Sequence, residues 1–341
     1  MNRQDSKSTE IISEDTRHTL TGIVNSLQEV PQLASAFQLQ LETLDKFYGL
    51  ARTIGGNACP IEPLAKNLLD LEHNFFSMLF LAVTRAIVAD STHMPLYGMV
   101  NQGMRAWVTA CDNLLDDEYK AIFRFEAAGD GNRMRSVLTL LLADRVIFEY
   151  ICKEYGDCDL VARVGRISLA ALMPSAIQES KEELRPVQVL SPEELLHTVH
   201  QQKTADLFTA TLAVPATLEH IESARLDAAK QAVANFGLAC QILDDLKDMQ
   251  VDIIEGRHNY LVSTISAEQG TGWLTEQRNG PIDSWDSWER FPANVAAARL
   301  VAQGLFTQAF EDFAAIGLDL NTQLQDGIVE LMYLILQVSQ E

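Results

Sequence analysis

Apolar residues recur with helical spacing along nearly the whole chain, and this periodicity constrains the possible fold most. Leu20, Ile23 and Leu27 fall on one face of a helix. Residues 195–212 and 224–249 carry the same wide apolar stripe. No run of alternating β-branched residues is bounded by paired turn signals, so no strand is expected. The periodicity therefore predicts an all-α protein.

Clusters of glycine and proline divide the chain into helical segments without dividing it into domains. Ser191, Pro192 and two following glutamates form a strong helix start, with a capping residue and acids near the helix dipole. No shift in composition marks a domain boundary, so we expect a single domain over residues 1–341, with residues 1–15 flexible. The expected breaks are residues 54–63, 128–132, 184–192 and 270–292, the last an irregular excursion that contains three tryptophans.

The charge balance excludes several classes of partner. Asp and Glu total 47 against 26 Lys and Arg, which gives a formal net charge of −21. A surface this acidic repels nucleic-acid phosphates and anionic lipids at long range. The polar N-terminal segment has no apolar core, and no uninterrupted apolar run is long enough to span a bilayer, so we expect no membrane span and a cytoplasmic location. The five cysteines form no C-x-x-C pair, which favours reduced thiols.

Two clusters of aspartate are the most informative polar features. Asp112 and Asp116 stand four residues apart near the end of one predicted helix, and Asp244 and Asp248 repeat this spacing on another. On a helix, residues four apart lie about 6 Å apart along the axis and about 40° apart around it. Carboxylates in this arrangement repel one another, and a bridging Mg²⁺ ion would offset the repulsion.

The alternative interpretation of each cluster is a solvated acidic helix end, which is common in an acidic chain. The neighbouring residues favour a site. Leu243 and Leu246 alternate with the second acidic cluster, and Leu114 and Leu115 with the first. Both clusters therefore lie where an apolar helix becomes polar. Two such helices facing each other would form a metal-binding rim above an apolar cavity.

Several segments resemble motifs of the trans-isoprenyl diphosphate synthases, the polyprenyl synthetase family. Residues 236–248 resemble the second aspartate-rich motif, and residues 252–261 its continuation, with Arg257 where lysine is usual. The Lys203-Thr204 pair resembles the diphosphate-binding Lys-Thr segment. Residues 112–116 are similar to the first motif, with Asn113 in place of its second acid.

This resemblance implies an all-α bundle around a deep apolar cavity, with both motifs at its mouth. It also implies a set of ligands for several Mg²⁺ ions and for an allylic prenyl diphosphate, and a homodimer. The implied metal ligands are Asp112, Asp116, Asp244 and Asp248. The implied substrate contacts are Lys203, Thr204, Gln241 and Arg257. Three of the aspartates, Asp112, Asp116 and Asp244, and Lys203 are the implied catalytic residues. Trp107, with Val108, would close the cavity floor and limit the prenyl chain, although a core tryptophan is an equally common interpretation.

The chain departs from the family where a chain-elongating enzyme binds its second diphosphate. Residues 71–77 contain no Lys or Arg where the family has a Gly-Gly-Lys-Arg segment. The remaining candidate cations for this second site are Lys66, Lys120, Arg124 and Arg133. Three hypotheses follow. They are a prenyltransferase with unusual acceptor contacts, a class I terpene synthase that needs only the allylic diphosphate, and a non-catalytic partner subunit. We rank the prenyltransferase first.

Two histidines on adjacent turns, His197 and His200, form a weaker candidate for a metal site. No third ligand is placed nearby in the sequence. A polar helix face is therefore the favoured interpretation of this pair.

Overall fold

The computed structural model describes residues 22–23, 26–27, 29–88, 91–115, 119–126, 131–185, 188–274 and 287–338. This part of the chain is helical throughout apart from its connections, and its one β contact is an isolated bridge between Ile61 and Phe125. The all-α prediction is confirmed. The helices are α2 (Pro31–Gly55), η1 (Lys66–Leu69), α3 (Leu71–Ile87), α4 (Met94–Leu115), α5 (Asn132–Tyr155), α6 (Cys158–Glu183), α7 (Pro192–Leu195), η2 (Leu196–Ala205), α8 (Asp206–Ala210), α9 (Ala213–Leu218), α10 (Ser223–Glu255), α11 (Tyr260–Gln269), α13 (Ser287–Arg290), α14 (Pro292–Ala315) and α15 (Thr322–Ile335).

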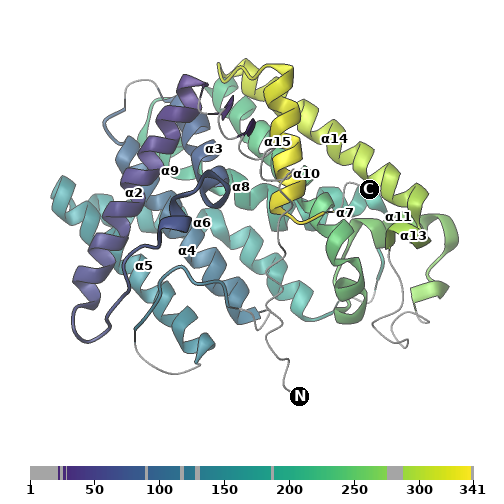
Figure 1. Cartoon of the computed structure of the whole chain (residues 1–341), viewed down its shortest axis with the longest axis horizontal. Helices are drawn as coiled ribbons and strands as arrows, with labels where there is room; N and C mark the ends of the chain where they lie inside the picture. The colour runs from purple at the N-terminus through teal and green to yellow at the C-terminus, as the bar shows by residue number, and fades with distance from the viewer. Residues whose placement is uncertain are drawn as a thin grey trace.

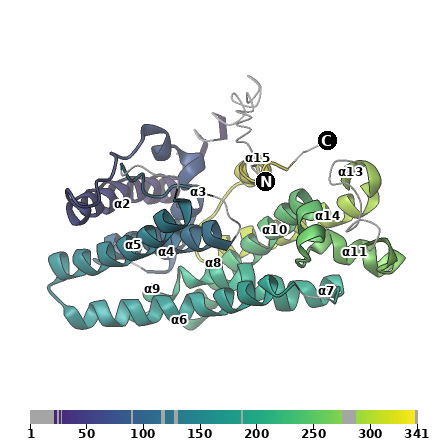
Figure 2. The same cartoon turned by 90° about the horizontal axis from the view of Figure 1, so that it is seen from below.

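The bundle is organised around α10, its longest helix at 33 residues. α14 packs along α10, α2 packs on α3, and α4 packs on α5 (Figure 1). Seen from below, α5 and α6 lie side by side at one edge of the molecule (Figure 2). The predicted helix over residues 224–249 is therefore real but extends to Glu255, where Gly256 in the left-handed region (φ 71°) ends it.

All four predicted breaks coincide with helix ends, the fourth with the end of α11 at Gln269 and the start of α14 at Pro292. α2 ends at Gly55, α5 begins at Asn132, and α7 begins at Pro192. Ser191 and Glu194 form the reciprocal capping box that the sequence favours, because the Ser191 side chain accepts from the Glu194 N–H while Glu194 accepts from the Ser191 N–H. Of the fourth break, residues 275–286 lie outside the described residues, as do residues 1–15. Trp273 packs against Phe291 with ring centroids 5.4 Å apart.

The segment over residues 195–212 differs from the predicted regular helix. A short α-helical turn leads into a π-helix, η2, and then into α8. A π-helix widens the turn to an i→i+5 hydrogen-bond pattern, and such segments are frequent at functional sites. Hydrophobic periodicity does not distinguish a π-helix from an α-helix over so short a stretch.

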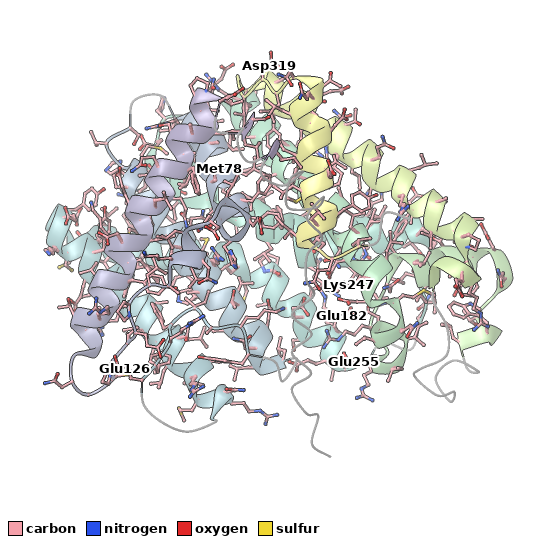
Figure 3. The ribbon with its side chains drawn as sticks, in the orientation of Figure 1. Met78, Glu126, Glu182, Lys247, Glu255 and Asp319 are labelled. Carbon is pink, nitrogen blue, oxygen red and sulfur yellow. The ribbon has the colours of Figure 1, made fainter. Side chains whose placement is uncertain are left out.

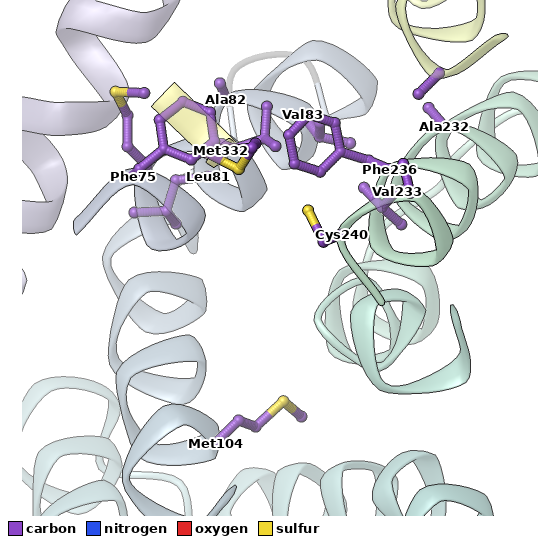
Figure 4. Close-up of a cluster of buried hydrophobic side chains, with 14 of the residues drawn as sticks. Phe75, Leu81, Ala82, Val83, Met104, Ala232, Val233, Phe236, Cys240 and Met332 are labelled. Carbon is purple, nitrogen blue, oxygen red and sulfur yellow. The ribbon is translucent and has the colours of Figure 1, made fainter. Parts of the chain in front are cut away.

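The core is built mainly from aromatic and aliphatic side chains of α3, α10 and α14. Phe236 of α10 contacts Phe75 of α3 and Phe306 and Phe313 of α14. Met104 of α4 and Cys240 of α10 are both buried in this core (Figure 4). The apolar face of α10 thus runs directly below the residues of the second acidic cluster.

By length and hydropathy alone, one described helix, α6, could cross a membrane. This differs from the expectation of no apolar stretch of sufficient length. A single such helix is weak evidence for a membrane span. In this structure α6 packs against α5, α8 and η2.

Candidate functional site

The two acidic clusters occupy the C-terminal parts of α4 and α10. Asp112 lies exposed in the last turn of α4, and Asp244 and Asp248 are half-buried on α10. Asp116 lies outside the described residues. Within the described part of the chain, no three His, Cys, Asp or Glu side chains are close enough to form a complete metal site. The described metal ligands implied by the resemblance therefore lie on two helices, and they do not form a cluster of three close side chains.

The electrostatics of the second cluster fit a cation. Burial, followed by the neighbouring charges of Asp248 and Asp245, raises the pKa of Asp244 to about 6. Burial also raises the pKa of Asp252, one turn beyond Asp248, to about 8. Carboxyl groups that are costly to ionise alone are stabilised as anions by a nearby divalent ion. The donor set is therefore of the kind that Mg²⁺ binds.

The second aspartate of this cluster, Asp245, is buried and hydrogen-bonded through both of its carboxylate oxygens. It is 2% exposed. Its Oδ1 accepts from Gln241 Nε2 at 2.8 Å, and its Oδ2 accepts from the Tyr260 N–H at 2.5 Å and lies 2.9 Å from His200 Nε2. Asp245 therefore joins three segments of the chain and is not available as a metal ligand.

Asn113 occupies the matching position of the first cluster and plays a matching structural role. Its side chain is buried, its Nδ2 donates to the Lys120 carbonyl at 3.0 Å, and its Oδ1 accepts from the Lys120 N–H at 2.7 Å. An amide suits this paired contact because it offers one donor and one acceptor. Asn113 thus anchors the main chain of Lys120 to α4.

Lys203 lies on η2 in an acidic environment. Its Nζ forms an ion pair with Glu179 Oε1 of α6 at 3.2 Å. Burial acts to lower the pKa of Lys203, but the charges of Glu179, Asp245 and Asp252 outweigh it and raise the pKa. The ammonium group is therefore firmly charged, as a diphosphate contact requires. Next to Lys203, the Thr204 hydroxyl donates to Gln241 Oε1 of α10.

Arg257 lies just after the end of α10, where the chain turns back. Its Nε pairs with Glu255 Oε2 at 3.0 Å. The following residue, His258, contacts Glu182 of α6, with Nδ1 2.7 Å from Oε1. Figure 3 shows Glu182, Lys247 and Glu255 in the same region of the molecule, where α6 and α10 end. Residues 256–258, here called the strap, are thus fixed to both helices.

Trp107 and Val108 lie on α4 below Asp112, and both are half-buried. Trp107 packs against the hydrophobic core. This placement is compatible with a cavity floor and with a core residue alike, so the proposed role in limiting the prenyl chain stays a prediction.

A pair of arginines near the first cluster includes one that our sequence reasoning missed. Arg105 precedes Asp112 by seven residues, so it lies two turns closer to the N-terminus of α4, on nearly the same face of this helix. Both Arg105 and Arg124 act electrostatically on Tyr48, whose pKa burial raises to about 12 and these two charges partly lower. Arg105 Nη1 donates to Asn74 Oδ1 at 3.5 Å. Among the described residues, neither guanidinium forms an ion pair with a carboxylate. In the sequence, the seven-residue spacing between Arg105 and Asp112 indicates that both residues lie on nearly the same helix face.

Two adjoining pockets lie elsewhere, between α14 and α15, with volumes of about 540 and 700 Å³. Both are lined by Arg299, Gln303, Phe306, Val329 and Tyr333. None of the sequence-predicted site residues lines them. The chemistry of the two acidic clusters, and not the size of these pockets, therefore defines the candidate site.

Comparison with known proteins points to one family. Residues 131–255 match the family model described as polyprenyl synthetase. No curated protein matches the sequence at a significant level. The matched segment contains Lys203, Thr204 and the whole second acidic cluster.

Solved structures extend the similarity over the rest of the chain. A decaprenyl diphosphate synthase from Rhodobacter capsulatus is similar at 17% identity and a TM-score of 0.59, covering 90% of this chain and 100% of that one. A geranylgeranyl pyrophosphate synthase from Lactobacillus brevis gives 15% identity, a TM-score of 0.56 and coverage of 90% and 96%. A polyprenyl synthase from Caulobacter crescentus, complexed with calcium and isoprenyl diphosphate, is similar at 16% identity and a TM-score of 0.57. The match covers 93% of this chain and 97% of that one. At these identities, the similarity establishes a shared fold.

Proposed function

We propose that this chain, whose residues 131–255 match the polyprenyl synthetase family model, is a Mg²⁺-dependent prenyltransferase. Its first substrate would be an allylic prenyl diphosphate. The observation that carries the proposal is the second acidic cluster, in which half-buried Asp244 and Asp248 lie on α10 above an apolar helix face, with Lys203 on the neighbouring η2. Asp112 and Asp116 would complete the metal site from α4.

The reaction begins with cleavage of the bond between the allylic carbon and the diphosphate oxygen. Bound Mg²⁺ would neutralise the negative charge that develops on the leaving diphosphate. Lys203 contributes a fixed positive charge for the same purpose, and Arg257 lies on the strap that would cover the diphosphate. The apolar side chains below, among them Met104 and Cys240, exclude water from the allylic cation. Attack by the acceptor's double bond on this cation and loss of a proton would then give the longer prenyl diphosphate.

Arg105 and Arg124 favour a transferase over a terpene synthase. A second diphosphate at the same cavity mouth needs cations of its own, because two polyanions otherwise repel each other. The two guanidinium groups of Arg105 and Arg124, both of which act electrostatically on Tyr48, would supply that charge. Arg105, which donates to Asn74 Oδ1, would then take the place of the lysine and arginine that residues 71–77 lack. A terpene synthase would have no need for cations at this position.

Product analysis tests the proposed function. The protein is incubated with Mg²⁺ and an allylic diphosphate, with and without isopentenyl diphosphate as the probe for the acceptor. A longer diphosphate, formed only when both substrates are present, is the expected result. A hydrocarbon or alcohol formed without the acceptor would establish a terpene synthase instead, and complete recovery of both substrates would indicate a non-catalytic subunit.

The acceptor site has its own variant and its own control. Arg105→Gln should raise the KM for the acceptor diphosphate at least tenfold while changing the KM for the allylic diphosphate little, because it removes one charged contact to the second substrate. Arg85→Gln, an exposed position on α3, is the matched control. An unchanged acceptor KM in Arg105→Gln would contradict the assignment of Arg105.

A homodimer is also part of the proposal, and α5 and α6 are its expected interface. These two helices lie together at one edge of the bundle (Figure 2) and expose large apolar side chains at helical spacing. They are Met134, Val137, Leu141 and Phe148 of α5 and Leu169, Met173 and Ile177 of α6.

Charged substitutions in this face test the dimer. Leu141→Glu combined with Leu169→Glu should convert a dimer to a monomer in analytical ultracentrifugation, because each change places a charge where apolar surface would be buried. Leu300→Glu, at a site equally exposed on α14, should leave the dimer intact. A monomeric unmodified protein at micromolar concentration would refute the interface.

A further inference from the structure

His200 occupies an unexpected position for one of two histidines that the sequence places on a polar helix face. His197 is exposed, in agreement with that interpretation, but His200 is 1% exposed. The interpretation is therefore wrong for His200. Both residues lie on η2, the π-helical segment that also carries Lys203 and Thr204.

The His200 ring has one polar contact in the described structure, and it is with Asp245. Nε2 lies 2.9 Å from Asp245 Oδ2, while Nδ1 is buried and has no hydrogen-bond partner among the described residues. Because the carboxylate oxygens are acceptors, Nε2 is the donating nitrogen of the ring. A buried polar group with a single partner depends strongly on that partner.

Asp245 connects His200 to the candidate site through its other hydrogen bonds. It follows Asp244 directly on α10, and it also holds the Gln241 side chain and the Tyr260 N–H. Tyr260 begins α11, two residues after the end of the strap that carries Arg257 and His258. The Asn259 side chain reinforces the same corner, because its Nδ2 donates to the Asp245 carbonyl at 2.7 Å.

The contact also fixes η2 against α10. Lys203 follows His200 by three residues, and Thr204 on the next turn donates to Gln241, the residue that Asp245 holds. Hydrogen bonds from His200 and Thr204 therefore attach η2 to α10 at two adjacent points. The distance between the Lys203 ammonium and the carboxylates of Asp244 and Asp248 depends on this attachment.

We infer that His200 is a positioning residue of the diphosphate site, acting through Asp245 to hold η2, the second acidic cluster and the Arg257 strap in one arrangement. The inference rests on the proposed function. Residues that orient metal ligands from behind affect metal affinity or activity by about 10- to 100-fold when they are removed. His200 would belong to this class without touching metal or substrate.

The test compares three variants of the full-length protein by calorimetric titration with inorganic diphosphate in the presence of Mg²⁺. His200→Phe keeps the ring volume but removes the donor, and it should weaken diphosphate binding by about 10- to 100-fold. His200→Gln restores an N–H donor at a similar reach and should recover most of the affinity. His197→Phe, on the same π-helix but exposed, should bind as the unmodified protein does.

A second variant covers the case in which His200→Phe does not fold. His200→Asn stays polar but is too short to reach Asp245, and it should lose affinity to the same extent. Rescue by glutamine separates positioning from a mere contribution to stability, since a purely structural role would lower the melting temperature without changing the affinity of the folded protein. Unchanged diphosphate affinity in folded His200→Phe or His200→Asn would overturn the inference. Failure of the unmodified protein to bind diphosphate with Mg²⁺ would instead overturn the proposed function.

Discussion

Single residues in equivalent positions of the two acidic clusters have the same kind of role. Asn113 holds the main chain of Lys120, and Asp245 holds the main chain of Tyr260. In each cluster the residue after the first aspartate is buried and anchors a neighbouring segment. The difference between amide and acid reflects the partners, because Asn113 meets one donor and one acceptor while Asp245 meets donors only.

Asn113→Asp should therefore destabilise the protein, although it restores an acidic motif. The carboxylate would face the Lys120 carbonyl without a donor, at a cost of about 1–3 kcal/mol in the free energy of unfolding. Urea denaturation measures this change, and Asn132→Asp at the exposed start of α5 serves as the control. A more stable Asn113→Asp protein, or one with higher Mg²⁺ affinity, would show that Asn113 is a lost metal ligand after all.

Asp252 makes stability depend on pH. Its folded-state pKa of about 8 lies above the ordinary value of 3.8, chiefly because of burial, so the native state retains a proton that the unfolded state releases. The resulting stabilisation is complete below about pH 4 and is lost as the pH rises through about 8. Without metal, the free energy of unfolding of the unmodified protein should fall between about pH 4 and pH 8, and that of Asp252→Asn should fall less. Parallel curves for the two proteins would show that Asp252 ionises normally.

At the scale of elements, close contacts between helices decide which glycines are required. A Cβ atom on Gly103 of α4 would lie 2.2 Å from Ile147 Cδ1 of α5, while a Cβ on Gly165 of α6 would meet open space. Helix propensity favours alanine over glycine at both positions by about 1 kcal/mol. The sign of the effect therefore depends on the neighbouring helix.

We expect Gly103→Ala to destabilise the protein by about 1–3 kcal/mol through overpacking, and Gly165→Ala to stabilise it slightly. Ile147→Val removes the clashing methyl group and should recover part of the loss in the double variant. Thermal or urea denaturation of the unmodified protein, Gly103→Ala, Ile147→Val and the double variant measures the coupling between positions 103 and 147. Additive effects of Gly103→Ala and Ile147→Val would argue against this contact between α4 and α5.

At the scale of the whole molecule, the central expectation is that α4 and α10 contribute to one metal site. Mg²⁺ with inorganic diphosphate should then raise the melting temperature, because a ligand that binds only the native state stabilises it. Asp112→Ala and Asp244→Ala should each remove most of that shift. Asp227→Ala, on α10 but far from the second cluster, is the control. If both site variants kept the full shift, the two clusters would not share a site.

The sequence by itself determined the helical class, the helix ends at the four predicted breaks and the two acidic clusters. Helical periodicity is local, and capping signals such as Ser191 with Glu194 act within one turn. The spacing of Asp244 and Asp248 likewise needs only helix geometry to place both on one face. These features were readable because residues close in sequence fix them.

Only the tertiary structure decided the roles of residues whose partners are distant in sequence. His200 meets Asp245 across 45 positions, and Asn74, which contacts Arg105, precedes it by 31. Whether a histidine on a predicted helix is exposed or buried depends on the helix packed against it. Burial and charge from several segments likewise set the pKa values of Asp244 and Asp252. Local sequence patterns carry no information on such packing. The packing of η2 against α10 buries His200 and brings it into contact with Asp245 of the candidate site.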